Sequence, residues 1–190
     1  MAAEWSSLEV AKLIVSVATP VVVVGLGVVV TQAARRVEEA QWSNRKLIEK
    51  RLELYDMMAG PLNDLYCFFR TFGQFREVTP PIAIKRKRAL DKAYFASKFL
   101  MTPEFSKLYE EFIKGACFDP GKYQGEDAKL RSTIARQKAE RGRWDDAWDG
   151  LFVTDPAEVR TDDSVEAAYE ALMQRFAADC GVTAADALVR

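Results

Sequence analysis

The stretch of sequence that decides the fold is the apolar run Leu13-Ile14-Val15-Ser16-Val17-Ala18-Thr19-Pro20-Val21-Val22-Val23-Val24-Gly25-Leu26-Gly27-Val28-Val29-Val30-Thr31. It belongs to an uncharged segment, residues 13–34, that Lys12 precedes and Arg35 follows. As a helix, this segment would rise about 33 Å, which exceeds the roughly 30 Å hydrocarbon core of a bilayer. The sequence therefore predicts a transmembrane helix over residues 13–34.

Positive charges are concentrated after this predicted span. Lys12 is the only basic side chain before it, whereas several follow it closely: Arg35, Arg36, Arg45 and Lys46. Because basic residues favour the cytoplasmic side, we expect residues 1–12 outside the cell and the rest of the chain in the cytoplasm. This predicts a single-pass protein of the inner (plasma) membrane, with the lipid bilayer as a partner. A cleaved signal peptide is the alternative, but the residues before the run are acidic rather than basic.

Two small residues, Gly25 and Gly27, lie near the middle of the predicted span. Small residues allow helices in a membrane to approach closely. They carry no strict GxxxG spacing, so two interpretations stay open. The span is either a plain anchor or a helix that packs against copies of itself.

The remainder of the chain has the pattern of amphipathic helices. Apolar residues recur at spacings of three and four over the segment after the span: Ile48, Leu52, Tyr55, Met58, Leu62, Leu65, Phe69 and Phe72. Thr102-Pro103-Glu104 is typical of a helix start, and Asp119-Pro120-Gly121 is typical of a loop. We therefore expect an all-α chain, in which the transmembrane helix continues into juxtamembrane or stalk helices over 35–76 and a cytoplasmic helical bundle over 77–190.

Several kinds of chemistry are excluded by composition. The 190 residues include no histidine, which rules out a Ser-His-Asp triad, a Cys-His pair and histidine metal ligands. The three cysteines (Cys67, Cys117 and Cys180) are far apart, so we expect small core side chains rather than a zinc site or a disulfide framework. We expect no catalytic residue, no metal and no cofactor, and hence a protein that is not an enzyme.

Three clusters are candidate sites of interaction. Lys85-Arg86-Lys87-Arg88 could bind an anion, although four consecutive helical residues spread around the helix and are as easily solvated. Asp145 and Asp149 have the spacing of one helix face and could hold a cation, but no further ligand is apparent. The dense aromatic segment 66–75 is either bundle core or a face that binds a partner.

Some motifs resemble those of uncharacterised bacterial single-span membrane proteins that carry a cytoplasmic helical domain. The resemblance covers about residues 35–145 and rests on the following residues: Arg51 with Tyr55, Pro61-Leu62-Asn63-Asp64, Thr79-Pro80-Pro81 and Gly125-Glu126-Asp127-Ala128-Lys129-Leu130-Arg131. No established activity comes with it. Small anchored helical proteins of this kind are often effectors or sensors in bacterial stress and phage-defence systems, which is an association only.

Two hypotheses about function follow from the sequence. The first is a non-enzymatic membrane protein whose helical bundle binds a partner or senses a signal, and which forms homo-oligomers or acts as a self-assembling effector. The second is a membrane-anchored receptor that binds a nucleotide or an anionic lipid through basic helices. We do not expect a nucleic-acid partner, because the formal net charge is -1.

Overall fold

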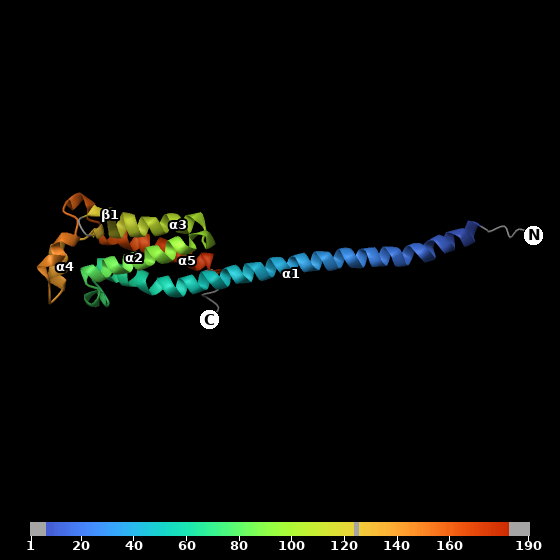
Figure 1. Ribbon diagram of the computed structural model, residues 1–190, viewed down its shortest axis with the longest axis horizontal. Helices are drawn as coiled ribbons and strands as arrows, with labels where there is room; N and C mark the ends of the chain where they lie inside the picture. Colours follow the sequence, from blue (N-terminus) through green and yellow to red (C-terminus); the bar gives the residue numbers. More distant parts are fainter. Residues whose placement is uncertain (1–6, 124–125, 183–190) are drawn as a thin grey trace, which may run out of the picture. The chain divides into compact units, whose positions relative to one another are not determined.

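The computed structural model describes residues 7–123 and 126–182. Within those ranges it leaves the side chains of residues 7–25, 40, 122 and 123 undescribed. The chain divides into two compact units between Lys46 and Leu47. Helix α1 (Ser7–Arg70) contributes residues to both units (Figure 1).

The first unit is the helical segment that ends at Lys46. All of its described side chains from Leu26 onward are exposed. The Thr31 hydroxyl donates a hydrogen bond to the Gly27 carbonyl over 2.8 Å, one turn back along the helix. No heavy atom of another part of the chain lies within 4 Å of a Cβ built on Gly27, so this glycine makes no close packing here. Gly25 lies outside the residues whose side chains are described.

The prediction of a transmembrane helix over 13–34 is wrong by this structure. Among the described residues, no helix combines the length and the apolar content that a membrane span needs. The start of the predicted span, residues 13–25, and the segment 1–6 lie outside the fully described residues.

The single-pass topology and the inner-membrane location are therefore corrected with the span. The lipid bilayer as a partner was inferred from the same run. Without the predicted span, nothing supports the topology-determining role that the sequence assigned to four basic residues: Arg35, Arg36, Arg45 and Lys46. In the structure these four side chains are exposed along α1.

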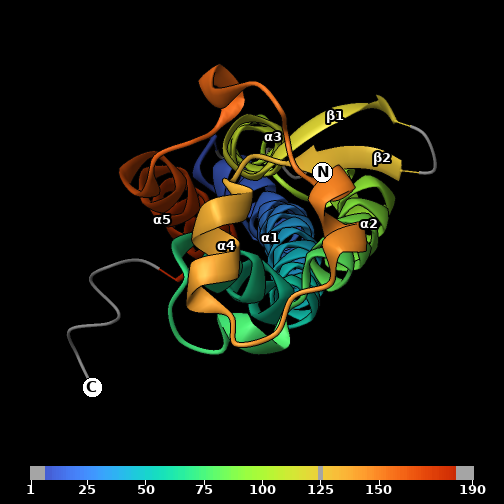
Figure 2. The ribbon, with the colours of Figure 1, turned by 90° about the vertical axis from the view of Figure 1, so that its left-hand side faces the viewer.

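The second unit is a helical bundle that is capped at one end by short elements. Its elements after α1 are η1 (Phe75–Glu77), α2 (Pro80–Ser97), η2 (Lys98–Leu100), α3 (Pro103–Glu110), the π-helical η3 (Glu111–Cys117), β1 (Phe118–Tyr123), β2 (Glu126–Leu130), α4 (Ile134–Glu140), η4 (Asp146–Leu151), η5 (Pro156–Glu158) and α5 (Asp162–Asp179). Figure 2 shows α2, α3 and α5 arranged around α1, with α4 across the end of the bundle.

The bundle core is aromatic. Its largest fully buried side chains come from all the long elements and include Tyr109, Phe68, Phe105, Phe112, Phe118, Phe152 and Phe176. Phe176 of α5 packs against Tyr55 of α1 and Phe105 of α3, at ring-centroid distances of 5.0 and 4.7 Å. Three of the five aromatic side chains of segment 66–75 are buried with them, whereas Tyr66 is partly buried and Phe72 is exposed. The interpretation of this segment as core is confirmed for Phe68, Phe69 and Phe75.

Polar contacts fix the ends of the helices. Thr102 caps α3, since its hydroxyl accepts a hydrogen bond from the Phe105 N–H, and Pro103 occupies the first turn as predicted. The Asp179 carboxylate at the end of α5 accepts hydrogen bonds from the backbone N–H and hydroxyl of Thr102. Arg51 donates to the carbonyls of Leu100 and Asp179 and so joins α1 to η2 and α5.

The expectation of an all-α chain is wrong for residues 118–130. Instead of the loop predicted from Asp119-Pro120-Gly121, β1 and β2 form an antiparallel hairpin in which Phe118 pairs with Leu130 and Asp119 with Lys129. Alternate residues of β2, Ala128 and Leu130, are buried against the core, which is the period of a strand. Arg131 fixes the hairpin because it donates to the Phe118 carbonyl and pairs with Asp119.

Candidate functional site

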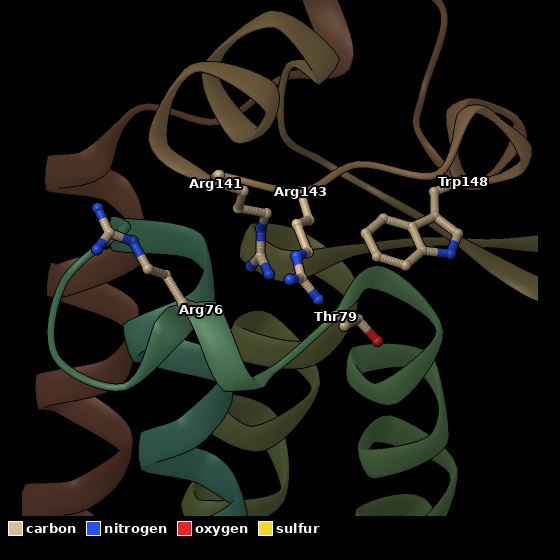
Figure 3. A pocket seen from close by; sticks show the side chains of 6 residues that line it. Arg76, Thr79, Arg141, Arg143 and Trp148 are labelled. Carbon is tan, nitrogen blue, oxygen red and sulfur yellow. The ribbon is translucent and has the colours of Figure 1, made fainter.

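The candidate site is a cavity of about 500 Å³ at the end of the second unit. Its described lining is basic and aromatic, and it includes no carboxylate: Arg76, Thr79, Arg141, Gly142, Arg143 and Trp148. Two connections supply most of these residues, one between α1 and α2 and the other between α4 and η4, and Trp148 lies in η4 itself. Figure 3 shows Arg141 and Arg143 extending from the second connection toward the first.

The first connection forms because α1 cannot continue past Arg70. Thr71 and Gly73 adopt φ angles of 56° and 59°, in the left-handed region that ends helices. Any residue other than glycine would be strained at position 73, and a Cβ there would meet the Cys67 Sγ at 3.4 Å. The reversed chain buries Phe75 and Val78, so that Arg76 between them points outward. Thr79 then starts α2 as its N-cap residue.

The second connection begins where α4 ends. Gln137, the fully buried residue of α4, donates from Nε2 to the Phe68 carbonyl at 3.1 Å and anchors α4 to the end of α1. Its Oε1 accepts a hydrogen bond from Arg141 Nε at 2.9 Å. Arg141 takes extended backbone angles, φ −108° and ψ 124°, which stop the helix and lead the chain toward Arg143.

Arg141 is a buried cation with only neutral partners. It is 7% exposed, and its Nη2 donates to the Phe75 carbonyl at 2.9 Å. Its guanidinium lies over the Phe68 and Phe75 rings, 5.0 and 5.3 Å from their centroids. Because burial removes water and no carboxylate compensates, the pKa of Arg141 falls to about 10. The site thus holds a desolvated positive charge at its base.

The other two arginines are exposed at the cavity. Arg76 Nε donates to the Glu140 carbonyl at 3.0 Å and packs over Phe75 at 5.5 Å. Arg143 makes neither a hydrogen bond nor an ion pair with any described residue. Within residues 7–123 and 126–182, none of Arg76, Arg141 and Arg143 pairs with a carboxylate, although most other arginines of the bundle do.

Trp148 and Thr79 complete the wall. The Trp148 ring packs edge-to-face against Trp144, with centroids 5.3 Å apart, and Trp144 in turn donates from Nε1 to Asp149 at 2.8 Å. Figure 3 places the Trp148 indole beside Arg143, on the side of the cavity away from Arg76. The Thr79 hydroxyl forms no capping hydrogen bond with α2, which leaves it available to a ligand.

This arrangement is suited to an anion. The guanidinium group offers a planar fork of donors that matches phosphate and carboxylate oxygens. The start of α2 contributes little to the positive potential, because its first two residues are Pro80 and Pro81, which have no N–H. The arginine side chains therefore provide the donors in this cavity.

The structure places the sequence-predicted basic cluster elsewhere and neutralises most of it. Lys87 is buried and forms ion pairs with Asp91 and Asp127, at 3.0 and 2.8 Å. Arg88 pairs with Glu126 and Asp127, and Arg86 with Asp64. Lys85 is exposed. Burial of Lys87 opposes its charge, but the hydrogen bonds to Asp127 and Asp91 raise its pKa. The cluster joins α2 to α1 and the hairpin rather than forming a ligand cradle.

The acidic pair and the cysteines also have structural positions. Asp145 caps η4 by accepting from the Ala147 N–H, while Asp149 pairs with Lys138 at 3.1 Å. Asp145 and Asp149 therefore serve different contacts. The three cysteines are free and buried, as expected of core side chains. Burial raises the pKa of the Cys180 thiol to about 11.

Sequence reasoning missed the arginine cavity as a site, though part of its signal was visible. Residues 129–143 carry a basic excess, and two tryptophans follow within five residues. The sequence alone could not show that Arg76, 65 residues earlier than Arg141, reaches the same place. It also could not show which cations would find carboxylate partners and which would not.

The comparisons with protein families, with curated proteins and with solved structures gave no match to this chain.

Proposed function

We propose that this chain is a receptor, rather than an enzyme, and that the cavity around Arg76, Arg141 and Arg143 binds a phosphate-bearing anion. One observation carries the proposal: Arg76, Arg141 and Arg143 line one cavity, and none of the three pairs with a carboxylate among the described residues. The proposal shares with the second function expected from the sequence a receptor that binds its ligand through basic residues. Those residues lie in the α4–η4 connection rather than on α2. The role as a sensor of a signal stays a prediction.

The unbalanced positive charge at the cavity favours an anion. Arg141 has lost most of its water and received only carbonyl, amide and aromatic partners in return. Two of its nitrogens are engaged, while Nη1 has no hydrogen bond to a described residue. An anion bridging Arg141 and Arg143 would supply the missing counter-charge, and charge-assisted hydrogen bonds are about twice as strong as neutral ones.

The experiment is a thermal-shift titration of the full chain with pyrophosphate, against sodium chloride at equal ionic strength. A ligand at 100 times its Kd stabilises the native state by about 2.7 kcal/mol, which shifts the Tm of a chain this size by about 5–10 °C. Arg143→Gln should remove most of this shift, because it removes one of the donors to the anion. The Tm of the free protein should change little, because Arg143 makes no hydrogen bond or ion pair with a described residue. Lys92→Gln, which removes one exposed positive charge elsewhere on α2, is the matched control.

Two results of this titration would contradict the proposal. The first is that pyrophosphate gives no more stabilisation than sodium chloride. The second is that Arg143→Gln and Lys92→Gln leave the same shift as the wild type, because then the anion binds elsewhere.

Self-association is the second candidate function, and the end of α2 favours it. Phe99 is 88% exposed and Phe95 is also exposed, with Lys98 Nζ above both rings at 5.2 and 5.8 Å. If this surface joins two copies of the chain, light scattering after gel filtration should give twice the monomer mass. Phe99→Asp should restore the monomer, whereas Ala89→Asp, exposed on the same helix, should not. A monomer at all concentrations would refute it.

A further inference from the structure

The cavity has more room than a phosphate group needs. Its volume of about 500 Å³ falls within the roughly 300–1,000 Å³ that is usual for small-molecule sites. An inorganic phosphate bound between the arginines would leave most of this space to water. The size of the cavity therefore indicates an organic ligand that carries its phosphate at one end.

The two sides of the cavity differ in chemistry. Arg141 and Arg143 lie between Arg76 and Trp148, so that cations occupy one side and an indole the other (Figure 3). Trp148 is half-buried, and the edge-to-face contact with Trp144 holds its ring in place. Trp144 is itself fixed by Phe152, at a centroid distance of 5.8 Å, and by its bond to Asp149. The aromatic side of the site is therefore held in place before a ligand binds.

Two further polar groups border the cavity. The Thr79 hydroxyl is without a capping bond, and the Trp148 indole N–H has no acceptor among the described residues. A hydroxyl can both donate and accept, whereas the indole N–H only donates. The Thr79 hydroxyl therefore complements a sugar hydroxyl, whereas the indole N–H, on the ring edge away from Arg143 (Figure 3), complements an acceptor at the edge of a base.

We infer that the ligand of this cavity is a nucleoside mono- or diphosphate, with its phosphates on Arg141 and Arg143 and its base against Trp148. This inference rests on the proposed function, since it names the class of the phosphate-bearing ligand. The base supplies a π-face to the indole, and the sugar occupies the space near Thr79. Figure 3 places Arg143 beside the indole and Arg141 farther from it, so that a base on Trp148 would leave the phosphates along the two guanidinium groups.

The test compares ADP with pyrophosphate by calorimetric titration of the full chain, because the two probes share a diphosphate and differ in the nucleoside. Stacking of one base predicts that ADP binds about 5- to 150-fold more tightly than pyrophosphate. Trp148→Leu should reduce the ratio of the two affinities to about threefold or less, while Trp148→Phe should keep most of it. Lys92→Gln should keep the wild-type ratio.

The outcomes separate this inference from the proposed function. Equal affinities for ADP and pyrophosphate in the wild type, or a ratio that Trp148→Leu leaves unchanged, would overturn the nucleotide but keep the anion site. Failure of both probes to bind would overturn the proposed function and this inference with it. A single-stranded oligonucleotide that binds far more tightly than ADP would overturn the assignment of a mononucleotide.

Discussion

Gln137→Leu should be one of the most damaging single substitutions at the end of the bundle. Leucine is similar to glutamine in size, so the change opens little empty space. It removes one hydrogen bond to the Phe68 carbonyl, at 3.1 Å, and one from the Arg141 guanidinium, at 2.9 Å. A neutral bond contributes about 1 kcal/mol and a bond to a charged group about 1.5–3 kcal/mol. Since both partners stay buried, we expect a loss of about 3–4 kcal/mol.

Urea denaturation of the full chain, followed by tryptophan fluorescence, measures this loss as a change in the free energy of unfolding. Gln174→Leu makes the same chemical change at an exposed position of α5 and should stay within about 0.5 kcal/mol of the wild type. If Gln137→Leu costs no more than Gln174→Leu, the buried amide does not hold α4 on α1. The pocket would then lack the support described for Arg141.

Three further predictions concern the bundle. Asp179→Asn should cost about 2–3 kcal/mol at pH 7. Burial opposes ionisation of this carboxyl, but hydrogen bonds from Thr102 and Arg175 lower its pKa, so the wild type should lose more stability than the variant as the pH falls below about 4, and denaturation at pH 7 and pH 3 should show a smaller difference between the two proteins at pH 3. Phe176→Ala should cost about 3–5 kcal/mol by the same assay, because its ring fills the space between Tyr55 and Phe105. Cys180, buried with a pKa of about 11, should resist a thiol reagent at pH 8 until denaturant is added, and rapid native labelling would contradict its burial.

The helical bundle was predictable because its signals are local. The spacing of Met58, Leu62 and Leu65 indicates one buried helix face, and all three are fully buried in the structure. Thr102-Pro103 marks the start of a helix through capping chemistry, which depends on neighbours in sequence alone. Such patterns need no knowledge of the rest of the fold.

The hairpin and the site could not be predicted for the opposite reason. The strand β2 shows its period of two over only five residues, and it is stabilised by its partner and by Arg131 rather than by its own composition. The membrane span was predicted from a hydropathy pattern, and the described residues contain no helix that meets its requirements. Which arginines pair with carboxylates depends on contacts such as that between Arg136 and Asp162, 26 residues apart.

The most direct test of the arginine site is a crystal structure of the full chain with saturating pyrophosphate. The account predicts one anion per chain within hydrogen-bond distance of the guanidinium groups of Arg141 and Arg143, in the cavity that Arg76 and Trp148 border. Such density would establish where the anion binds and which donors hold it. An empty cavity, or an anion held by Lys85 and its neighbours on α2 instead, would contradict the account.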